Sequence, residues 1–249
     1  MNILVLMAGR GQRFRDKGYD KPKPLIEVNG KTILEWTTES CPYIKHGGVG
    51  QDTNIHLYFA VLQDHLDNGL GEFLYSVYGE NIHIVPFDKI TKGNLETAYI
   101  SSHTMQFENE ELLILDSDNK YSGSGIESFI TMLPKDTDTT AIFVFNTNDT
   151  SLPNKWANAM VDGNIVKGIR EKEDSWVTHP SLIGMFYFST TSYFTNSAHK
   201  ILNEYTPVKG EYYMSMVPTY TTKEVYAYTV TDVVPLGTPH DVQLFGRIE

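Results

Sequence analysis

The sequence contains a single cysteine, Cys41, among its 249 residues. One cysteine excludes a disulfide within the chain and leaves no cysteine cluster for a structural metal site. Cys41 also has no evident partner in the sequence that would make it a nucleophile. We therefore expect a protein of a reducing compartment, the cytoplasm.

Basic residues are scarce as well, since 20 lysines and arginines stand against 31 acidic residues, giving a net charge of −11. This balance argues against general affinity for nucleic acid or for an anionic membrane surface. The sequence has no apolar run long enough to span a membrane, no internal repeat and no Gly/Ser-rich linker. With 41% hydrophobic residues it is long enough to bury a sizeable core. We expect one domain over residues 1–249.

Apolar runs of strand length recur along the chain, and most are continuous rather than alternating. Continuous apolar character is typical of parallel strands that are covered on both faces. The runs lie at residues 3–7, 56–61, 82–87, 112–116, 140–145 and 183–188. Helical stripes lie between them, one from Leu66 to Val77 and a weaker one from Ala98 to Met105. This alternation predicts an α/β protein with a doubly wound, mostly parallel, Rossmann-like sheet.

The pattern changes after about residue 150. The stretch "WANAMVDGNIVKGI" predicts a hairpin that turns at Asp162 and Gly163. We expect a small antiparallel subregion here, covering a substrate pocket.

Glycines and cations gather directly after the first apolar run, in "AGRGQRF" at residues 8–14. Gly9 and Gly11 permit backbone conformations in which successive amide N–H groups turn onto a phosphate. Arg13 adds a planar, permanently charged fork for phosphate oxygens. The alternative is a tight strand-to-helix turn with solvated arginines. The stretch therefore predicts either a local phosphate site or an ordinary turn.

Two lysines follow in "KPKPLIEVNGKTILEW". Each proline restricts the backbone, so the loop that carries Lys21 and Lys23 is stiff. A stiff loop holds ammonium groups in place, although a proline-rich surface turn with two solvated lysines has the same composition.

Together, G-x-G-x-R-F and the K-P-K-P-L that follows some ten residues later resemble the nucleotidyltransferase superfamily, which makes nucleotide-sugars and CDP-linked small molecules on a GT-A-like fold. The resemblance implies a nucleoside triphosphate bound by Met7, Ala8, Gly9, Arg10, Gly11 and Gln12. It also implies Arg13 at the β- and γ-phosphates and Lys23 at the reacting α-phosphate, both as catalytic residues. In this interpretation the nucleotide is bound by about residues 1–150 and the acceptor by about residues 151–249.

Further stretches follow the family pattern in the same order. "PFDKITKGNLETAY" resembles the base-binding segment, with Gly93 allowing close approach and Asn94, Glu96 or Thr97 facing the base. A plain helix start at Thr91 or Asn94 accounts for the same residues.

"LLILDSDNKY" ends an apolar run with two carboxylates, and the resemblance places Mg²⁺ on Asp118. A hard cation takes oxygen ligands and bridges phosphate oxygens, so this position suits it. Asp116 points the same way if the strand continues, and is the candidate second ligand. Two turn-forming aspartates are the alternative.

The second half carries the segments that the resemblance assigns to the acceptor. Glu171 would bind hydroxyl or amine groups, and Lys172, the third catalytic cation, would contact the attacking phosphate. Glu211 and Tyr212 would close the acceptor site. The near-terminal "LGTPHD" matches another family element, but Pro235 stands where sugar-1-phosphate thymidylyltransferases carry a metal-binding aspartate. A second ligand at Asp232 or Asp241, or a single metal held by phosphates and Asp118, both stay open.

The resemblance implies a nucleotidyltransferase that moves NMP from an NTP to a small phosphorylated acceptor with Mg²⁺ and releases pyrophosphate. The opening resembles short bacterial capsule-locus enzymes more than typical sugar enzymes, which implies a precursor of a surface polysaccharide and, together with Pro235, favours CTP slightly. The acceptor is either a hexose-1-phosphate or a non-sugar such as phosphocholine or phosphoglutamine. Because relatives are often dimers or tetramers, the resemblance also allows a homo-oligomer. Two alternatives remain. "DSD" at residues 116–118 fits a D-x-D glycosyltransferase that uses a nucleotide-sugar, and a non-catalytic nucleotide sensor fits the proline at 235.

Overall fold

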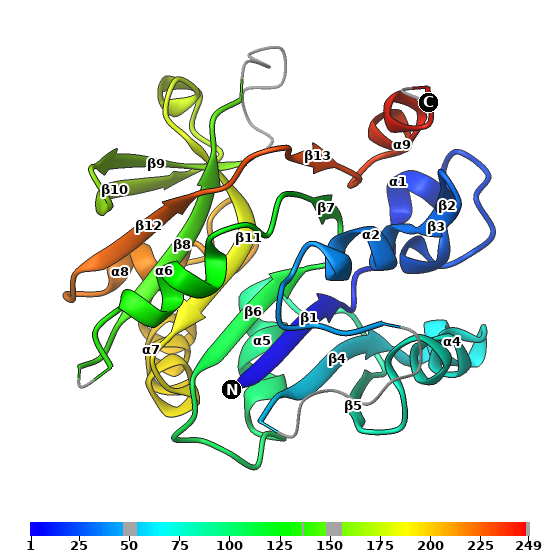
Figure 1. The fold of residues 1–249 in the computed structure, drawn as a ribbon, viewed down its shortest axis with the longest axis horizontal. Helices are drawn as coiled ribbons and strands as arrows, with labels where there is room; N and C mark the ends of the chain where they lie inside the picture. The colour runs from blue at the N-terminus through cyan, green and yellow to red at the C-terminus, as the bar shows by residue number, and fades with distance from the viewer. Residues whose placement is uncertain (47–53, 136, 148–155, 248–249) are drawn as a thin grey trace. The chain divides into compact units, whose positions relative to one another are not determined.

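The structure is a computed structural model that describes residues 1–46, 54–135, 137–147 and 156–247. The chain forms two compact units whose segments alternate along the sequence (Figure 1). One, here called the N-terminal unit, comprises Ile3–Ile90, Asp116–Ser124 and Thr231–Glu249. The other, here called the central unit, comprises Met1–Asn2, Thr91–Leu115 and Gly125–Val230.

The N-terminal unit is built on strands that the sequence marks by unbroken apolar runs. They are β1 (Asn2–Met7), β4 (His56–Leu62) and β5 (Ile82–Phe87), in the order β5-β4-β1. β4 and β5 are parallel, with Leu57 opposite Ile82. Every residue of β1 is buried, as expected for a strand covered on both faces.

Short helices and strands complete this unit. They are α1 (Gln12–Arg15), η1 (Lys23–Leu25), β2 (Glu27–Val28), β3 (Lys31–Thr32), α2 (Ile33–Glu39), α3 (Gln63–Asp67), α4 (Leu70–Tyr78), β7 (Asn119–Lys120), β13 (Val234–Pro235) and α9 (Pro239–Phe245). α2 begins with a capping box, in which the Thr32 side chain accepts from the Glu35 amide and the Glu35 side chain accepts from the Thr32 amide.

A hydrophobic cluster joins the two ends of the chain within the N-terminal unit. Its buried members are Phe14, Ile26, Val28, Ile33, Leu236, Val242 and Phe245. Tyr19 packs edge-on against Phe14 with ring centroids 5.3 Å apart, and Trp36 donates its indole N–H to the Val28 carbonyl at 2.9 Å. This cluster anchors α1, the loop of η1 and the segment around Leu236 to one another.

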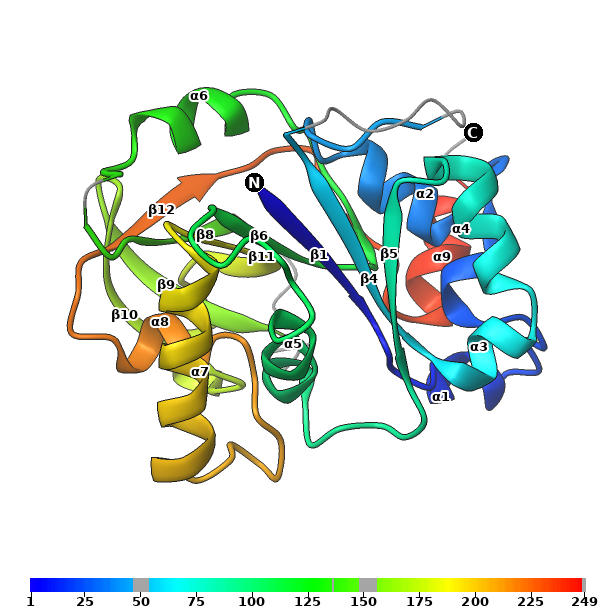
Figure 2. The same ribbon diagram turned by 90° about the horizontal axis from the view of Figure 1, so that it is seen from below.

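The central unit contains a mixed sheet in the order β6-β11-β8-β12-β10-β9. Its strands are β6 (Leu112–Asp116), β8 (Thr140–Phe145), β9 (Ala157–Asp162), β10 (Ile165–Glu171), β11 (Ser181–Phe188) and β12 (Val225–Thr229). Gly163 turns the β9–β10 hairpin at a φ of 60°, so the hairpin expected at Asp162 and Gly163 is confirmed. Helical segments are α5 (Asn94–Ser102), α6 (Ile126–Met132), η2 (Asp174–Trp176), α7 (Thr191–Glu204) and α8 (Met216–Tyr220). α7 packs on α5, α8 and β11, and Figure 2 shows α5 and α8 on either side of α7.

The expectation of a mostly parallel, Rossmann-like sheet is wrong for the central unit. β11 runs antiparallel to both β6 and β8, and β10 runs antiparallel to β9 and β12. The unbroken apolar run in β11 indicates that the strand is buried on both faces. A central antiparallel strand can be buried in this way just as a parallel strand is, so the run does not determine strand direction.

The apolar stripe from Leu66 to Val77 also differs from expectation. It forms two helices, α3 and α4, because Gly69 between them adopts a left-handed φ of 88°. The glycine ends one helix and begins the next without a steric penalty.

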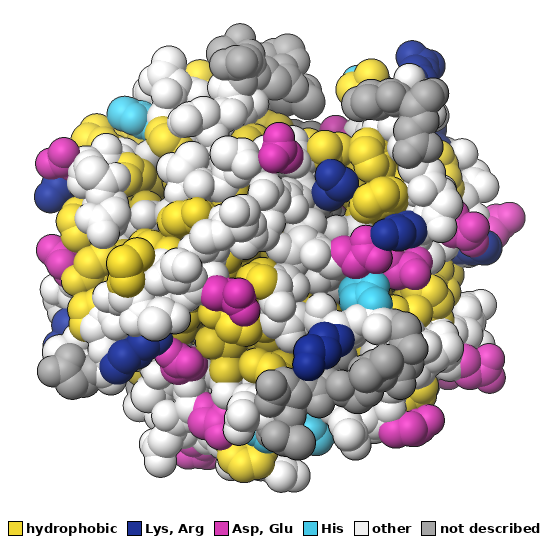
Figure 3. Space-filling view, in the orientation of Figure 1, with side chains coloured by type: hydrophobic (Ala, Val, Ile, Leu, Met, Phe, Trp, Pro, Cys, Tyr) yellow, Lys and Arg dark blue, Asp and Glu magenta, His cyan; other side chains and the backbone are white. Residues whose placement is uncertain are grey.

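Charged side chains are scattered over the face drawn in Figure 3, where lysine and arginine of the described residues stand among aspartate and glutamate. Within the described ranges, no helix is both long and apolar enough to cross a membrane.

Candidate active site

The glycine-containing loop leaves β1 at its carboxyl end. Met7 and Ala8 are buried, and the chain then emerges through Gly9 and Arg10, which are exposed. Gly11 is the N-cap of α1 and has left-handed angles of φ 63° and ψ 33°. Within the described residues, the amide groups of Arg10 and Gly11 donate no hydrogen bond to the backbone. Two N–H groups are thus available to an anionic ligand.

The side chains of α1 divide between anchoring and exposure. Phe14 is 1% exposed and belongs to the hydrophobic cluster, so it fixes the helix in place. Gln12 donates to Asp16 at 2.6 Å on the exposed side. Arg13 is exposed, and its guanidinium group has no hydrogen bond or ion pair among the residues described. The guanidinium group of Arg13 is therefore not bound by any described side chain.

Lys23 and Asp118 lie together although 95 residues separate them in the sequence. The Lys23 ammonium group donates to Asp118 Oδ2. The two side chains are 18% and 27% exposed, so they are reachable by a ligand yet less screened than a surface pair. The backbone of Asp118 is fixed from the other end of the chain, because the Leu236 amide donates to its carbonyl at 2.8 Å.

A glycine stands against each member of this pair. A Cβ on Gly11 would lie 3.0 Å from the Lys23 Cβ, and a Cβ on Gly237 would lie 3.0 Å from Asp118 Oδ2. Gly11 belongs to the G-x-G-x-R-F motif and Gly237 to the L-G-T-P motif. Both motifs therefore approach the Lys23–Asp118 pair so closely that a side chain at either glycine would displace its neighbour by a few tenths of an ångström.

Replacing Gly237 with alanine is expected to displace the Asp118 carboxylate by a few tenths of an ångström, because the new methyl group contacts Oδ2 directly. We expect kcat to fall several-fold in the assay described below while the melting temperature changes little. The control is Gly71→Ala on α4, where a Cβ would meet only Leu66 Cδ2 at 3.6 Å. Equal activity of the two variants would contradict the contact between position 237 and Asp118.

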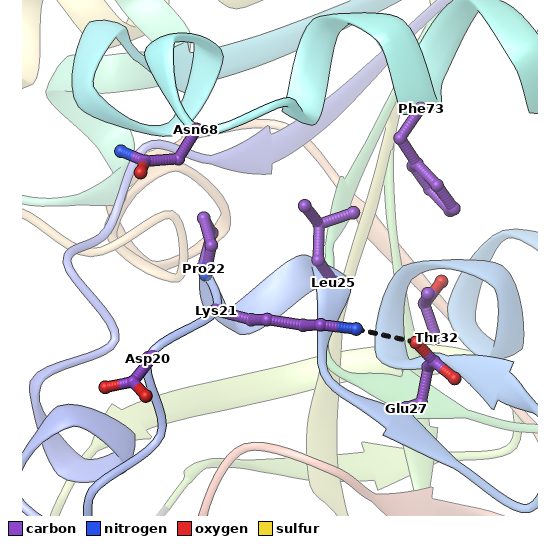
Figure 4. A pocket seen from close by; sticks show the side chains of 8 residues that line it. All are labelled: Asp20, Lys21, Pro22, Leu25, Glu27, Thr32, Asn68 and Phe73. Carbon is purple, nitrogen blue, oxygen red and sulfur yellow. Dashed lines mark hydrogen bonds and ion pairs between the residues drawn. The ribbon is translucent and has the colours of Figure 1, made fainter.

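Lys21, the other lysine of K-P-K-P, has a different partner. Its ammonium group donates to Glu27 Oε1 at 2.8 Å, with both side chains 63% exposed. Figure 4 shows this ion pair at a cavity of about 380 Å³. The cavity is lined by Asp20, Lys21, Pro22, Leu25, Glu27, Thr32, Asn68 and Phe73. The two lysines of the motif are therefore distinguishable, and only Lys23 meets a carboxylate of the D-S-D motif.

The three carboxylates considered above as a second metal ligand, those of Asp116, Asp232 and Asp241, have surroundings that differ from those of Asp118. Asp241 lies in the first turn of α9 and is bound to the N-cap residue Thr238, since its amide donates to Thr238 Oγ1 at 3.2 Å and its carboxylate accepts from that hydroxyl at 2.7 Å. Asp232 is exposed in a left-handed turn at φ 55°, and Asp116 is half-buried at the end of β6. Among the residues described, no group of three His, Cys, Asp or Glu side chains is arranged to hold a metal ion.

In the central unit, Gly93 and Asn94 form the start of α5. A Cβ on Gly93 would lie 2.2 Å from the Tyr212 carbonyl oxygen, and the glycine has a φ of 144°. Asn94 Oδ1 accepts from the Met214 amide at 2.9 Å. Nearby, the Glu96 side chain accepts from the Lys92 amide. Position 93 thus needs a glycine because the backbone of Tyr212 lies too close for a Cβ. Binding of a nucleotide base by Gly93 and Asn94 stays a prediction.

Replacing Gly93 with alanine is expected to destabilise the protein by about 2–4 kcal/mol, the range of a core clash that backbone atoms cannot relieve cheaply. The clash is with backbone nitrogen, carbon and oxygen of Tyr212 rather than with a flexible side chain. Denaturant unfolding of the variant beside Gly71→Ala measures the difference. Unchanged stability would contradict the close approach of the Tyr212 backbone.

Glu171, the last residue of β10, and Lys172, which follows it, lie in a cluster of polar contacts. Ser215 donates to Glu171 Oε2 at 2.6 Å. The Lys172 ammonium group donates to the Tyr213 hydroxyl and lies 4.3 Å from the centre of that ring. Lys209 donates to the Lys172 carbonyl at 3.0 Å, and both lysines have left-handed φ values of 51° and 48°. Such a backbone persists only where surrounding contacts hold it, and these contacts do so for Lys172.

Two residues named for the acceptor differ in position. The Tyr212 hydroxyl donates to the Tyr205 carbonyl at 3.1 Å, so it secures the end of α7. Glu211 is exposed. Burial of the Tyr213 ring, followed by the hydrogen bond and charge of Glu211, raises the pKa of Tyr213. Tyr213 therefore stays protonated beside Lys172 at neutral pH.

Burial raises the pKa of Glu171 above its usual value of 4.5, against the lowering effects of the Ser215 hydrogen bond and of Lys172. A carboxyl group with a raised pKa in the folded state contributes stability below its ordinary pKa. That stability is lost as the pH rises through the folded pKa.

Glu171→Gln removes the charge and keeps an oxygen for Ser215. We expect the melting temperature of this variant, relative to wild type, to increase as the pH rises from 4 to 7. Glu173→Gln, at an exposed neighbour, is expected to give a flat difference. A difference for Glu171→Gln that shrinks with rising pH would contradict the raised pKa.

Comparisons with known proteins agree with this geometry at the level of the fold. The chain is similar over its whole length to a nucleoside-diphosphate-sugar pyrophosphorylase from Vibrio cholerae, with a TM-score of 0.75, 16% identity and coverage of 99% of this chain and 100% of the other. It is also similar to the inositol-1-phosphate CTP transferase of T. maritima, with a TM-score of 0.71, 19% identity and coverage of 99% and 95%. These likenesses show that the chain shares the fold of these two proteins.

In sequence, the chain is 37% identical over 98 residues to the N-acetylmuramate alpha-1-phosphate uridylyltransferase of Neisseria meningitidis serogroup B. The match spans 39% of this chain and 38% of the relative. No family model matches the sequence.

Proposed function

We propose that this chain, which has the fold of the nucleotidyltransferase superfamily, transfers a nucleotidyl group from a nucleoside triphosphate to a small phosphorylated acceptor and releases pyrophosphate. The observation that supports it most is the Lys23–Asp118 pair between Gly11 and Gly237. It unites a cation, a carboxylate and two closely approaching backbone segments, which are the groups that a triphosphate with a divalent cation requires.

In this proposal, the donor is bound by residues of the N-terminal unit. The free amide groups of Arg10 and Gly11 donate hydrogen bonds to phosphate oxygens, and Arg13 binds the β- and γ-phosphates. Lys23 stabilises the charge that develops on the oxygens of the α-phosphate as the acceptor phosphate attacks and pyrophosphate leaves. No covalent nucleophile on the protein is needed, because alignment and charge neutralisation supply the acceleration.

Asp118 is the residue of this chain that fits Mg²⁺. Mg²⁺ is commonly held by one or two carboxylates together with substrate phosphates and water, so a single well-fixed carboxylate suffices. Gly237 leaves the Oδ2 side of Asp118 uncovered by any side chain at that position, as a ligand site requires. The cation would neutralise phosphate charge when bound. The Lys23 ammonium group, now on Oδ2, would turn to the phosphates.

The acceptor is proposed to bind at the cluster in the central unit. Glu171 would accept hydrogen bonds from hydroxyl or amine groups, and Lys172, oriented by Tyr213 and Lys209, would bind the acceptor phosphate. Glu211 is exposed near Tyr213 and is proposed to contact the acceptor as well.

CTP is the proposed donor, and the product is proposed to be a nucleotide-activated precursor of a surface polysaccharide. The name of the T. maritima neighbour supports CTP, whereas the name of the Neisseria relative supports UTP and a sugar phosphate. The base and the acceptor are therefore tested together.

The test is pyrophosphate release with Mg²⁺, using CTP, UTP, dTTP, ATP and GTP, each against pooled acceptors. One pool holds hexose-1-phosphates and the other holds phosphocholine, phosphoethanolamine and phosphoglutamine. Release with one nucleotide and one pool supports the proposal and identifies base and acceptor class. Nucleotide binding without release in any combination contradicts it and favours a sensor.

A further inference from the structure

A second cavity in the central unit lies where three chain segments meet. It has a volume of about 160 Å³ and lies beside α7, α8 and the turn that leads into β12. Its apolar floor includes Ile201 and Val217, both buried. None of the residues named for the proposed reaction lines it.

Aromatic rings form part of its wall. Tyr205, the C-cap of α7, and Tyr220, the last residue of α8, pack against each other in a tilted arrangement with ring centroids 4.3 Å apart and an interplanar angle of 32°. Tyr193 is held in place by a contact between its hydroxyl and Thr221 Oγ1 at 3.1 Å. Tyr220 is 41% exposed, so part of this aromatic wall is open to a ligand. The wall suits a flat or apolar body.

Two lysines, Lys200 and Lys223, also line the cavity, and no carboxylate does so among the residues described. Both lysines are exposed, and neither ammonium group has an ion pair or hydrogen bond to the described part of the chain. In a chain with a net charge of −11, two unpaired cations at one cavity form a local positive field.

The cavity has more hydrogen-bond donors than the two oxygens of a carboxylate ligand could accept from. Besides the lysines, the hydroxyl groups of Tyr205, Tyr220 and Thr222 have no hydrogen bond to other described residues. A phosphate monoester offers three terminal oxygens and about two negative charges, and it matches this set of donors better. The volume corresponds to that of about five water molecules, which limits the organic part to roughly one ring.

We propose that this cavity is a binding site for a small organic phosphate that carries one ring or an apolar group of that size. The phosphate would lie between Lys200 and Lys223, and the ring against Tyr220. The cavity also shares α8 with the Glu171 cluster, because α8 follows directly after Ser215, which donates to Glu171. A ligand would therefore contact the helix next to that cluster.

Isothermal titration calorimetry with phenyl phosphate tests the site, with orthophosphate and phenol as probes of each half alone. We expect phenyl phosphate to bind at least tenfold more tightly than either probe. The double variant K200A/K223A is expected to lose at least tenfold in affinity. The double variant K89A/K167A changes net charge equally at exposed lysines outside the cavity and is expected to bind as wild type does.

The variant K23A separates this site from the proposed nucleotide site. It is expected to bind phenyl phosphate as wild type does, whether or not the chain has the proposed activity. Loss of binding in K23A would overturn the proposal, because the ligand would then occupy the nucleotide site. Wild-type affinity in K200A/K223A, or no saturable binding to the wild type, would also overturn it.

Discussion

Lys23→Ala is expected to lower kcat for pyrophosphate release by about 10²–10³-fold, the usual loss when one preorganised donor to developing charge is removed. In the proposed reaction, Lys23 offsets negative charge that grows on the α-phosphate, so its loss acts on the transition state. Because Lys23 is partly exposed and lies outside the hydrophobic cluster, the fold should remain. Initial rates at saturating nucleotide, with circular dichroism as a check on folding, give the result.

Lys21→Ala is the matched control for this prediction. It removes the same charge two residues away, from an ion pair whose two side chains are each 63% exposed. Exposed pairs contribute about 0–1 kcal/mol, so neither activity nor stability should change much. Similar losses of kcat in both variants would contradict the assignment to Lys23, since they would reflect the loop's overall charge.

Asp118→Asn is expected to lower kcat by at least about 10²-fold and to raise the Mg²⁺ concentration for half-maximal activity, because the amide keeps the shape of the side chain but loses its charge. Asp67→Asn, at an exposed aspartate on α3, serves as the control and should behave as wild type. Titrating Mg²⁺ in all three proteins measures both parameters.

The shape of the Mg²⁺ titration distinguishes two roles for Asp118. If the carboxylate binds the metal, half-saturation moves to higher Mg²⁺ in the asparagine variant. If it only positions Lys23, kcat falls while half-saturation stays in place. The second outcome would contradict the metal assignment and leave the ion pair as the sole role of Asp118.

Local patterns in the sequence predicted the positions of strands well where burial alone determines the apolar pattern. The six apolar runs correspond to β1, β4, β5, β6, β8 and β11, and the Asp162–Gly163 turn lies between β9 and β10. The parallel direction predicted for β11 was wrong, because burial on both faces gives a central antiparallel strand the same apolar composition as a parallel one. Gly69 indicates the break between α3 and α4 in the sequence, but a prediction based on the spacing of apolar residues alone does not take this glycine into account.

The candidate site was predictable only through motifs. Neither the contact of Lys23 with Asp118 nor that of Gly237 with Asp118 follows from local sequence, since sheet topology brings these segments together. Ser215, Tyr213 and Lys209 were missed. Tyr213 adjoins the tyrosine that was named instead, and only the chain's path through the cluster decides which ring meets Lys172.

The central claim, attack on the α-phosphorus of a nucleotide, is tested most directly by following isotopic label. Wild-type protein is incubated with Mg²⁺ and the pooled acceptors, using nucleotide labelled with ³²P at either the α- or the γ-phosphate. The account predicts that α-label enters a new acceptor-linked product and that γ-label leaves as pyrophosphate. Transfer of γ-label to the acceptor, or its release as orthophosphate, would contradict it.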